Sequence, residues 1–347
     1  MAGGGPTLRG VADADLRRRP TPLWTFPLDG PTVSSPVAAE GRVFVGAANG
    51  KLQAISLDDG AACWSYSTDA AIEASPLVVE GRVFVGSTDA WFYALDARDG
   101  RLLWRRETGA KIVGGANWFV ARDGQARVVV GSHDHRLYCF AAADGAPIWS
   151  YVSGNYVNAT PAVEGENVVF GGCDAVVHAV WARNGTALAR VDLGAGCHIA
   201  AAVALAGTRA FLGHYGNRFV CVDLATANVV WSYPSDGQPF FAPPAIAGNR
   251  VVFGGRDRHL HCARADDGAP LWTFPTGKSI EGAPVICGTG VVFGSGDGRL
   301  YCVSLARGEL LWEYEIGPAL VASPAVVGDT IVVAAADGRV HALRAAP

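Results

Sequence analysis

The chain has 347 residues, half of them hydrophobic, and a net charge of −4 from 28 Lys and Arg against 32 Asp and Glu. This length allows one large domain or two smaller ones, each with a sizeable core. The charge balance lacks the basic excess that neutralises phosphates, which excludes nucleic acid as a partner. No segment reaches the roughly 18 apolar residues of a membrane-spanning helix.

The first twenty residues differ in composition from the rest. They contain glycines at 3–5 and arginines at 17–19 but no apolar run of seven or more, unlike a secretory signal. We therefore expect residues 1–20 to form a flexible segment suited to a linker, and the chain as written to be cytoplasmic. A true start further upstream would instead make the protein periplasmic.

The stretch from Gly86 to Trp104 contains a unit that recurs along the chain. Two short apolar runs flank Asp99-Gly100, a dipeptide that favours a tight hairpin turn. Similar hairpins recur along the chain at intervals of about forty residues. The apolar run that precedes the hairpin occurs eight times. The Trp residues that close these units are Trp24, Trp64, Trp104, Trp149, Trp231, Trp272 and Trp312.

Eight units of about forty residues, each with four short strands, predict an all-β, eight-bladed β-propeller. A single unit cannot bury its apolar faces, whereas each blade of a ring is covered by its two neighbours. The last unit ends at Leu343 without a Trp strand, and the strand Leu23–Phe26 precedes the first complete unit. We therefore expect one domain over residues 21–347 in which the N-terminal strand completes the last blade and leaves no open edge.

One interior strand position always carries a small residue. In chain order it is Ala54, Ala94, Cys139, Ala179, Cys221, Cys262, Cys302 and Ala342. Packed sheets lie about 10 Å apart, too far for these Cys to form disulfides with one another. We expect free thiols that fill the core.

The pattern Ala-Leu-Asp, Asp-Gly, Trp between Ala94 and Trp104 resembles the tryptophan-docking repeat of the PQQ-like, quinoprotein dehydrogenase-like propellers, and the resemblance spans roughly residues 21–347. It implies that the repeat Trp side chains pack between adjacent blades. Quinone-dependent dehydrogenases of this superfamily are similar in having a longer chain, an adjacent Cys pair under the cofactor and a bound calcium ion. No two Cys are adjacent here. The lipoprotein propellers that assist outer-membrane protein assembly are similar in size, but they carry a secretory signal and a lipidated Cys.

One face of the predicted ring has monotonous Asp-Gly and Glu-Gly turns, whereas the loops of the other face vary from unit to unit. The residue three positions before the repeat Pro is Val33, Glu73, Gly114, Asn158, His198, Phe241, Glu281 and Val321. Because the innermost strand begins there, these side chains should surround the mouth of the channel. The candidate ligand-binding residues are Glu73, Lys111, Asn158, His198, His214, Tyr215, Arg256, Lys278 and Glu281. The alternative is a solvated rim of mixed charge.

Departures from the repeat gather in one sector. Unit three has an extra stretch around 117–125, unit four has Ala189 in place of the Trp, and unit five lacks both the Pro, with Ala201 there, and the hairpin Gly, with Ala227 there. Such departures are where functional sites are expected, although drift in a stable scaffold leaves the same mark.

Histidines do not by themselves indicate a metal site. His178, His261 and His341 share a strand position with Tyr93, Tyr138 and Tyr301, so we interpret them as hydrogen-bonded packing residues. The Asp between His133 and His135 recurs in the same turn of other units and is explained by turn chemistry. The metal content is left undetermined.

We predict a monomeric, non-enzymatic binding module without a cofactor, whose variable face takes a protein or peptide partner or a small anionic ligand. One alternative is a quinone-binding protein or PQQ-dependent oxidoreductase. Calcium ligands would then come from Glu73, Asn158 and Glu281, and cations for the cofactor carboxylates from Lys111, Arg256 and Lys278. The other alternative is a scaffold that assists outer-membrane protein assembly.

Overall fold

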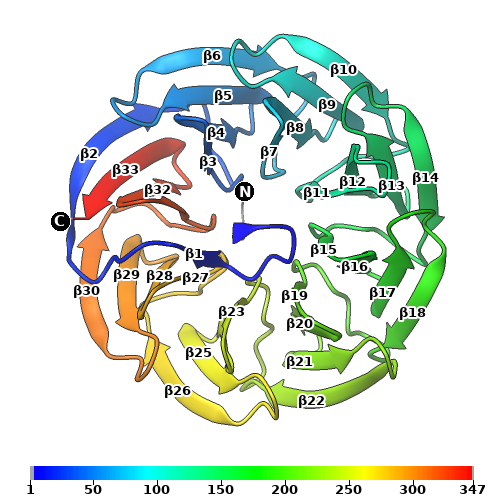
Figure 1. Cartoon of the computed structure of the whole chain (residues 1–347). Coiled ribbons are helices and arrows are strands. Elements are labelled where there is room, and N and C mark those ends of the chain that lie inside the picture. The colour runs from blue at the N-terminus through cyan, green and yellow to red at the C-terminus, as the bar shows by residue number, and fades with distance from the viewer. Residues whose placement is uncertain (1–3, 346–347) are drawn as a thin grey trace.

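The computed structural model describes residues 4–345, which form eight antiparallel sheets around a central channel (Figure 1). In every sheet the shortest strand lines the channel and a longer strand lies at the circumference. The predicted eight-bladed, all-β propeller is confirmed. No helix among residues 4–345 is long and apolar enough to cross a membrane.

The first four blades follow chain order from the channel outward. Blade 1 contains β3 (Val37–Ala39), β4 (Arg42–Gly46), β5 (Lys51–Ser56) and β6 (Ala62–Ser67). Blade 2 contains β7 (Leu77–Val79), β8 (Arg82–Gly86), β9 (Trp91–Asp96) and β10 (Leu102–Glu107). Blade 3 contains β11 (Asn117–Val120), β12 (Ala126–Ser132), β13 (Arg136–Ala141) and β14 (Pro147–Val152). Blade 4 contains β15 (Ala162–Glu164), β16 (Asn167–Gly171), β17 (Val176–Trp181) and β18 (Ala187–Asp192).

The second four blades repeat this order with two additions from the N-terminus. Blade 5 contains β19 (Ala204–Ala206), β20 (Arg209–His214), β21 (Arg218–Asp223) and β22 (Asn228–Pro234). Blade 6 contains β23 (Ala245–Ala247), β24 (Arg250–Gly254), β25 (His259–Arg264) and β26 (Pro270–Pro275). Blade 7 contains β27 (Val285–Cys287), β28 (Gly290–Gly294), β29 (Arg299–Ser304) and β30 (Leu310–Glu315), with β1 (Val11–Ala12) inside β27. Blade 8 contains β31 (Ala325–Val327), β32 (Thr330–Ala334) and β33 (Arg339–Ala345), with β2 (Pro20–Pro27) outermost.

The N-terminal strand closes the ring. Strand β2 pairs with β33 in antiparallel register, so that Trp24 lies opposite Ala342 and Thr25 opposite His341. This pairing joins the two ends of the chain in one sheet, as Figure 1 shows for the blue β2 beside the red β33. The prediction that the N-terminal strand completes the last blade is confirmed.

Each repeat Trp except Trp312 donates a hydrogen bond to the blade that follows its own. The indole Nε1 of Trp104 donates to the carbonyl of Ala142 at 3.1 Å, and that of Trp64 to Ala97 at 3.0 Å. The hairpin Gly of the following blade lies flat against the indole. A Cβ placed on Gly100, where φ is +75°, would stand 2.6 Å from the ring of Trp64. A side chain at this position would push the two blades apart.

The seam between blades 4 and 5 replaces both halves of this contact. Ala189 stands where blade 4 should present its Trp, and Ala227, with a φ of 55°, stands where blade 5 should present its Gly. The indole ring fits only where the hairpin residue has no Cβ. Where the Trp is absent, a Cβ at the hairpin position does not clash with a ring. The two departures are therefore one change, which an apolar cluster with Leu8 and Leu224 accommodates.

Residues 4–19 contact the ring, whereas we expected a flexible segment over residues 1–20, of which residues 1–3 lie outside the described part of the chain. They run through the channel and then outward to β2, and β1 pairs in parallel with β27 (Figure 1). Leu8 and Leu16 are buried. The carbonyl of Leu16 accepts the Nε1 of Trp312 at 2.6 Å, in the way that Leu57 serves Trp24. The closing blade has no hairpin between its last two strands, and Leu16 supplies the acceptor that such a hairpin would provide.

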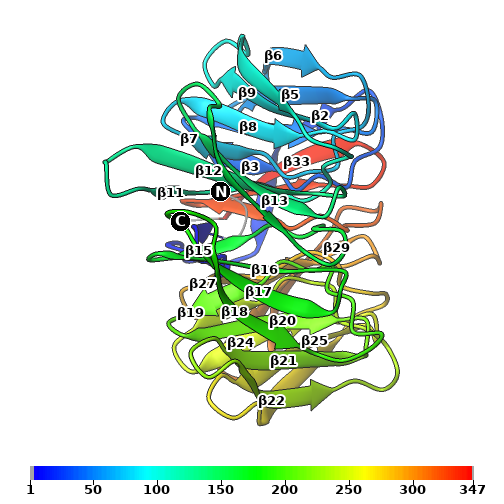
Figure 2. The same cartoon turned by 90° about the vertical axis from the view of Figure 1, so that its right-hand side faces the viewer.

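The extra stretch of blade 3 is a longer hairpin. Strand β11 ends at Val120 and β12 begins at Ala126, whereas two residues separate the corresponding strands of blade 2. Figure 2 shows this hairpin extending past its neighbours at one face of the ring. It belongs to the face of the tight turns, away from the predicted binding rim.

Candidate functional site

Eight matching backbone hydrogen bonds build the rim of the variable face. In each blade the turn after the second strand donates one N–H to a carbonyl of the loop that enters the blade. Examples are His133 N to Lys111 O and Tyr215 N to His198 O, both at 3.0 Å. The two loops of every blade are thereby held in one geometry, so that corresponding side chains occupy corresponding places.

These bonds define two sets of rim residues, one from each loop. The donor set is Ala48, Thr88, His133, Cys173, Tyr215, Arg256, Gly296 and Ala336. The acceptor set is Pro31, Ala71, Lys111, Tyr156, His198, Pro239, Ser279 and Ala319. Each acceptor is followed by one buried residue, and the residue after that one belongs to a third, inner set. The inner set is Val33, Glu73, Val113, Asn158, Ala200, Phe241, Glu281 and Val321.

Two positions of the predicted inner set need correction. Val113 replaces Gly114 in blade 3, and Ala200 replaces His198 in blade 5, where His198 belongs to the acceptor set. The strand register likewise places Val203, not Ala201, at the Pro position of blade 5. Blades 3 and 5 lack the Pro that marks this register in the other units, and the prediction slipped there.

Large side chains of the three sets gather over blades 3 to 7, and we name this group the rim arc. Its members are Lys111, His133, Tyr156, Asn158, Cys173, His198, Tyr215, Phe241, Arg256 and Glu281. In blades 8, 1 and 2 the same positions carry Ala, Pro, Val and Thr, with Glu73 as the exception. The backbone repeats around the whole rim, but recognition groups are concentrated on one side.

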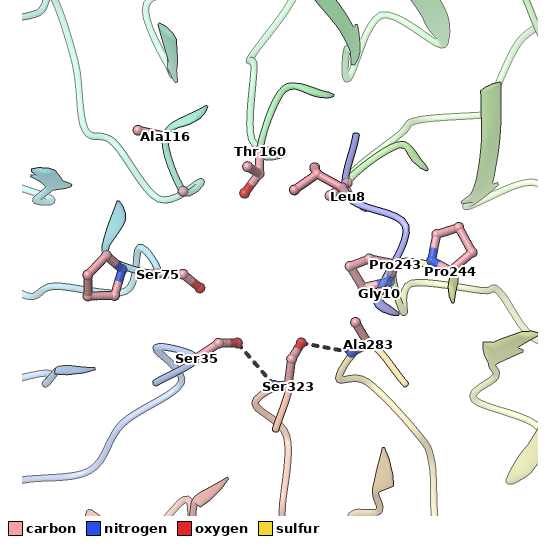
Figure 3. A pocket seen from close by; sticks show the side chains of 13 residues that line it. Leu8, Gly10, Ser35, Ser75, Ala116, Thr160, Pro243, Pro244, Ala283 and Ser323 are labelled. Carbon is pink, nitrogen blue, oxygen red and sulfur yellow. Dashed lines mark hydrogen bonds between the residues drawn. The ribbon is translucent and has the colours of Figure 1, made fainter. Parts of the chain in front are cut away.

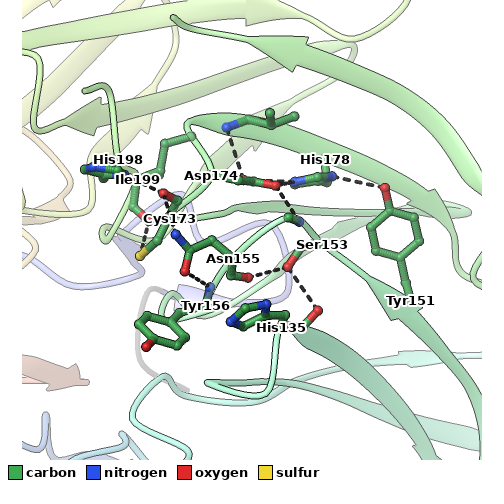
Figure 4. Close-up of polar contacts among 12 residues, drawn as sticks. His135, Tyr151, Ser153, Asn155, Tyr156, Cys173, Asp174, His178, His198 and Ile199 are labelled. Atoms are coloured by element: carbon green, nitrogen blue, oxygen red, sulfur yellow. Dashed lines mark hydrogen bonds and ion pairs between the residues drawn. The ribbon is translucent and has the colours of Figure 1, made fainter. Parts of the chain in front are cut away.

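The first half of the rim arc is held by stacking and by contacts to Cys173. The rings of His133 and Tyr156 stack with centroids 4.5 Å apart. Asn158 donates through Nδ2 to the sulfur of Cys173 at 3.2 Å, and Nδ1 of His198 contacts the carbonyl of the same Cys. Figure 4 shows Tyr156, Cys173 and His198 coming from neighbouring loops onto this surface.

The second half of the rim arc is a chain of aromatic and ionic contacts. Tyr215 packs on Phe241 with ring centroids 4.4 Å apart, and the guanidinium of Arg256 lies 4.3 Å from the centroid of the same Phe ring. Arg256 also donates through Nε to Oε1 of Glu281 at 2.9 Å. Arg256 and Glu281 line a shallow hollow of about 570 Å³ together with Lys278. This hollow brings three of the predicted site residues together.

Unpartnered polar atoms mark the blade 3 and 4 part of the arc. The Nε2 of His133 and the Oδ1 of Asn158 are buried and have no hydrogen-bond partner among residues 4–345. Burial, with a smaller contribution from the charge of Lys111, lowers the pKa of His133. A smaller, opposite contribution to this pKa comes from the side chain of Asn158, so a polar ligand group here would compete with the contact between His133 and Asn158.

Two predicted residues lie apart from this surface. His214 is only 2% exposed and sits below the rim, where its Nδ1 accepts the N–H of Gly216 at 3.0 Å. Burial lowers its pKa to about 4. Glu73 is exposed on blade 2, between Val33 and Val113 of the inner set. The structure thus assigns His214 to the core and separates Glu73 from the rim arc.

Tyr156, Phe241 and Cys173 are rim residues that the predicted site omitted. Phe241 was aligned correctly but was set aside as apolar. Tyr156 lies two residues before the aligned position Asn158, and Cys173 lies in the turn after the second strand, so neither stands at the position counted from the Pro. When the eight repeats are aligned on the donor and acceptor positions of the rim hydrogen bonds, Cys173 falls in the donor set, Tyr156 in the acceptor set and Phe241 in the inner set.

A small cavity lies on the channel axis inside the ring. It has a volume of about 110 Å³, and Leu8 and Gly10 form part of its wall. The hydroxyls of Ser35, Ser75, Thr160 and Ser323 point into it (Figure 3). Ser35 and Ser323 accept backbone N–H groups from the preceding blades at 3.0 and 2.8 Å, which orients the side chains toward the channel.

The residues proposed for calcium and quinone do not form one site. Glu281 is paired with Arg256, Asn158 is bonded to Cys173, and Glu73 lies on blade 2 away from both. Among residues 4–345 no three His, Cys, Asp or Glu side chains are grouped so that they could hold a metal ion. The donor set therefore does not fit a calcium-bound quinone.

One family model matches nearly the whole of this propeller. The family model described as outer membrane protein assembly factor BamB matches residues 17–118, 111–174, 173–319 and 242–346. The chain belongs to this family. No curated protein matches it in sequence.

Solved structures that resemble this BamB-family chain include a BamB, a designed protein and a dehydrogenase. BamB from Moraxella catarrhalis is 18% identical with a TM-score of 0.78, over 94% of this chain and 100% of that one. The computationally designed Ika8 protein is 17% identical with a TM-score of 0.80, over 93% and 99%. The quinohemoprotein alcohol dehydrogenase from Comamonas testosteroni is 15% identical with a TM-score of 0.83, over 99% and 80%. At these identities the likeness shows the fold alone.

Proposed function

We propose that this BamB-family chain is a non-enzymatic interaction module that binds a protein or peptide partner through the rim arc. The single observation that carries the proposal is the contiguous run of aromatic and charged side chains over blades 3 to 7. Small residues occupy most corresponding places of the other blades, although the backbone bonds beneath both halves are the same.

The composition and exposure of the rim arc suit a protein partner. Tyr, Phe and Arg are enriched at the energetic centres of protein interfaces. Tyr156 and Tyr215 are 44% and 49% exposed, which is high for aromatic side chains, and Arg256 is held in place by Phe241 and Glu281. Lys278 and Arg258 add positive charge to the same hollow. The complementary partner surface would present acidic and apolar groups.

The test compares matched substitutions in the two halves of the rim. Immobilised wild-type chain and the variants Tyr215→Ala, Arg256→Ala and Thr88→Ala would capture partners from an extract of the source cells, with cross-linking to identify contacts. We expect the two rim-arc variants to lose capture of a defined protein and Thr88→Ala, from blade 2, to retain it. Equal capture by all the variants would remove the rim arc from the interaction.

A control separates the interaction module from a small-ligand or quinone site. Titration of the same proteins with PQQ and calcium should give no cofactor absorbance and no dye reduction. A saturable signal that Arg256→Ala abolishes would instead favour a small anionic ligand at the hollow of blades 6 and 7.

A second candidate is the more specific role of a scaffold for outer-membrane protein assembly, which the family match favours. It makes the partner a component of that assembly machinery. Purified complexes from a cell that expresses the tagged chain would test it. If the complexes contained no outer-membrane assembly components but another partner still bound through the rim arc, the assembly role would be rejected and the general interaction role would stand.

A further inference from the structure

The N-terminal segment follows a track of backbone donors inside the channel. Four carbonyls of this segment accept N–H groups from the innermost strands of blades 4 to 7. The bonds join Val163 to Pro6, Leu205 to Thr7, Ile246 to Arg9 and Ile286 to Gly10, at 2.7 to 2.9 Å. The segment thus crosses four blades in an arc, making one backbone bond to each.

The four donors occupy the same place in the repeat. Each is the middle residue of its three-residue strand and lies opposite the second residue of the next strand, as Val163 lies opposite Val168. In an antiparallel hairpin the N–H of such a residue points away from the neighbouring strand. The propeller therefore directs one N–H per blade into the channel.

Three of these donors have no acceptor among the described residues. The equivalent residues of blades 8, 1 and 2 are Val326, Ala38 and Val78, which lie opposite Ile331, Val43 and Val83. No carbonyl of residues 4–345 accepts their N–H groups. In blade 3 the side chain of Asn117 serves the corresponding Trp118 N–H at 2.8 Å. The open donors are consecutive around the ring and continue the arc that the segment occupies.

Space adjoins the open part of this track. A cavity of about 410 Å³ is lined by Ala38, Val326 and their neighbours on one side and by residues of the N-terminal segment on the other. Its lining is small and uncharged apart from Asp13, which is exposed and makes no ion pair within residues 4–345. An extended chain with small side chains and one basic residue matches these features.

We propose that the inner edges of blades 8, 1 and 2 bind an extended peptide segment of a partner protein. The peptide carbonyls would accept the N–H groups of Val326, Ala38 and Val78, as the carbonyls of residues 6–10 accept those of blades 4 to 7. A basic side chain of the peptide would face Asp13. This site lies in the channel and does not depend on the rim arc.

The first experiment measures binding of a peptide probe to the full chain. The probe is a fluorescent, end-blocked peptide with the sequence of residues 5–12, Gly-Pro-Thr-Leu-Arg-Gly-Val-Ala, whose backbone already fits this track and which carries one Arg. Its mirror-image peptide made of D-amino acids is the control. We expect saturable binding of the L-peptide only, and Asp13→Asn should weaken it. Equal binding of both peptides, or no saturation, would overturn the proposal.

Matched Pro and Ala variants test the donors themselves. Val78→Pro and Val326→Pro remove an N–H that faces the channel, whereas Val78→Ala and Val326→Ala keep it, and an edge strand tolerates Pro at such a position. Loss of one hydrogen bond predicts that each Pro variant binds the probe about threefold to tenfold more weakly than its Ala counterpart. Equal affinities within each Pro and Ala pair would contradict the proposal.

A second measurement does not depend on whether the Pro variants fold, and it also tests whether the probe binds at another place in the channel. A photoreactive version of the probe, cross-linked to the wild-type chain, should attach to blades 8, 1 and 2. Attachment confined to blades 4 to 7, or tighter binding by Leu205→Pro, would show that the peptide displaces the protein's own segment. Either outcome would overturn the assignment of the open inner edges.

Discussion

Blades 3 to 7 and blades 8, 1 and 2 share one backbone and carry different surfaces. Every blade makes the same rim hydrogen bond between its two loops, and corresponding strands pair in the same register. The large rim side chains and most of the bound N-terminal segment nevertheless belong to blades 3 to 7. The features that all the blades repeat hold the ring together, and the features that one sector changes carry the proposed binding surface. This contrast can be tested by perturbing each kind of feature separately.

The largest expected effect comes from deleting residues 1–28. This deletion removes β2 and exposes the edge of β33, and it also removes Trp24 and Leu16, the acceptor for Trp312. An exposed strand edge over an apolar face promotes association between chains. We expect aggregation or a loss of stability of several kcal/mol, measured by size-exclusion chromatography and thermal melting.

A shorter deletion serves as its control. Removing residues 1–5 stops before Pro6, the first residue whose carbonyl bonds to an inner strand, and should change melting little. A monomeric protein with unchanged melting after the longer deletion would refute closure of the ring by β2.

The next effect concerns the Trp contacts between blades. Trp104→Ala should cost on the order of 3 to 5 kcal/mol, because the indole is buried and its Nε1 is bonded to Ala142. Ala189→Trp should not stabilise the seam of blades 4 and 5, since the Cβ of Ala227 stands where the indole would lie. Adding Ala227→Gly should make the double variant more stable than Ala189→Trp alone. Chemical denaturation of the single and double variants measures this coupling.

If the double variant were no more stable than Ala189→Trp, the two departures would be unrelated. The seam would then be an unpaired defect, and the explanation of Ala189 and Ala227 as one change would fail.

A smaller effect is expected from pH through His214. Its pKa in the folded chain is about 4 because of burial, below the ordinary value of 6.5. The unfolded chain therefore binds a proton more readily, so the stabilising contribution is present above pH 6.5 and is lost as the pH falls toward 4. The total is on the order of 3 kcal/mol. His214→Ser, which introduces the residue that blades 2 and 3 have there, should flatten the dependence of stability on pH between 6.5 and 4.

A substitution that removes no titratable group provides the comparison for this measurement. Thr88→Ser should leave the slope of unfolding free energy against pH unchanged. An equal slope in wild type and His214→Ser would place the titrating group elsewhere.

The smallest effect on stability should come from the rim arc. Lys111→Ala, Tyr215→Ala and Lys278→Ala remove exposed side chains and should change the free energy of unfolding by less than about 0.5 kcal/mol. Thermal melting checks this before any binding assay. Melting losses as large as that of Trp104→Ala would mean that these residues are packing groups and not a binding surface.

The fold could be predicted from the sequence because it rests on repeated local signals. The Asp-Gly of the hairpin, the Trp and the small interior residue recur in the units. Their roles in the turn, in the last strand and in the core can be inferred from the sequence of one unit. The ends of the chain were harder, since Leu16 lies eight residues before Trp24, whereas the acceptors of the other Trp side chains lie seven residues before the next repeat Trp, or Ala189. That shift of one residue hid the role of the segment.

The candidate site was predicted only in part, because loops carry no such repeat. Arg256, Lys278 and Glu281 are candidate residues that line one hollow, although the sequence did not predict that these three would meet. His214 was misplaced because a polar residue after a strand can point either to solvent or to the core, and the choice depends on its neighbours in space. Tyr215, the next residue, points outward.

The pairing of β2 with β33 also has a consequence for synthesis on the ribosome. The strand that contains Trp24 leaves the exit tunnel before every complete blade, and its partner, which contains His341, leaves after seven of them. Until His341 has emerged, Trp24 cannot reach its place, and the growing arc of blades has an uncovered flank at each end. Nascent chains of this length are open to mispairing with one another. We therefore expect the yield of soluble protein to depend on elongation speed and on chaperones more strongly than its final stability would suggest.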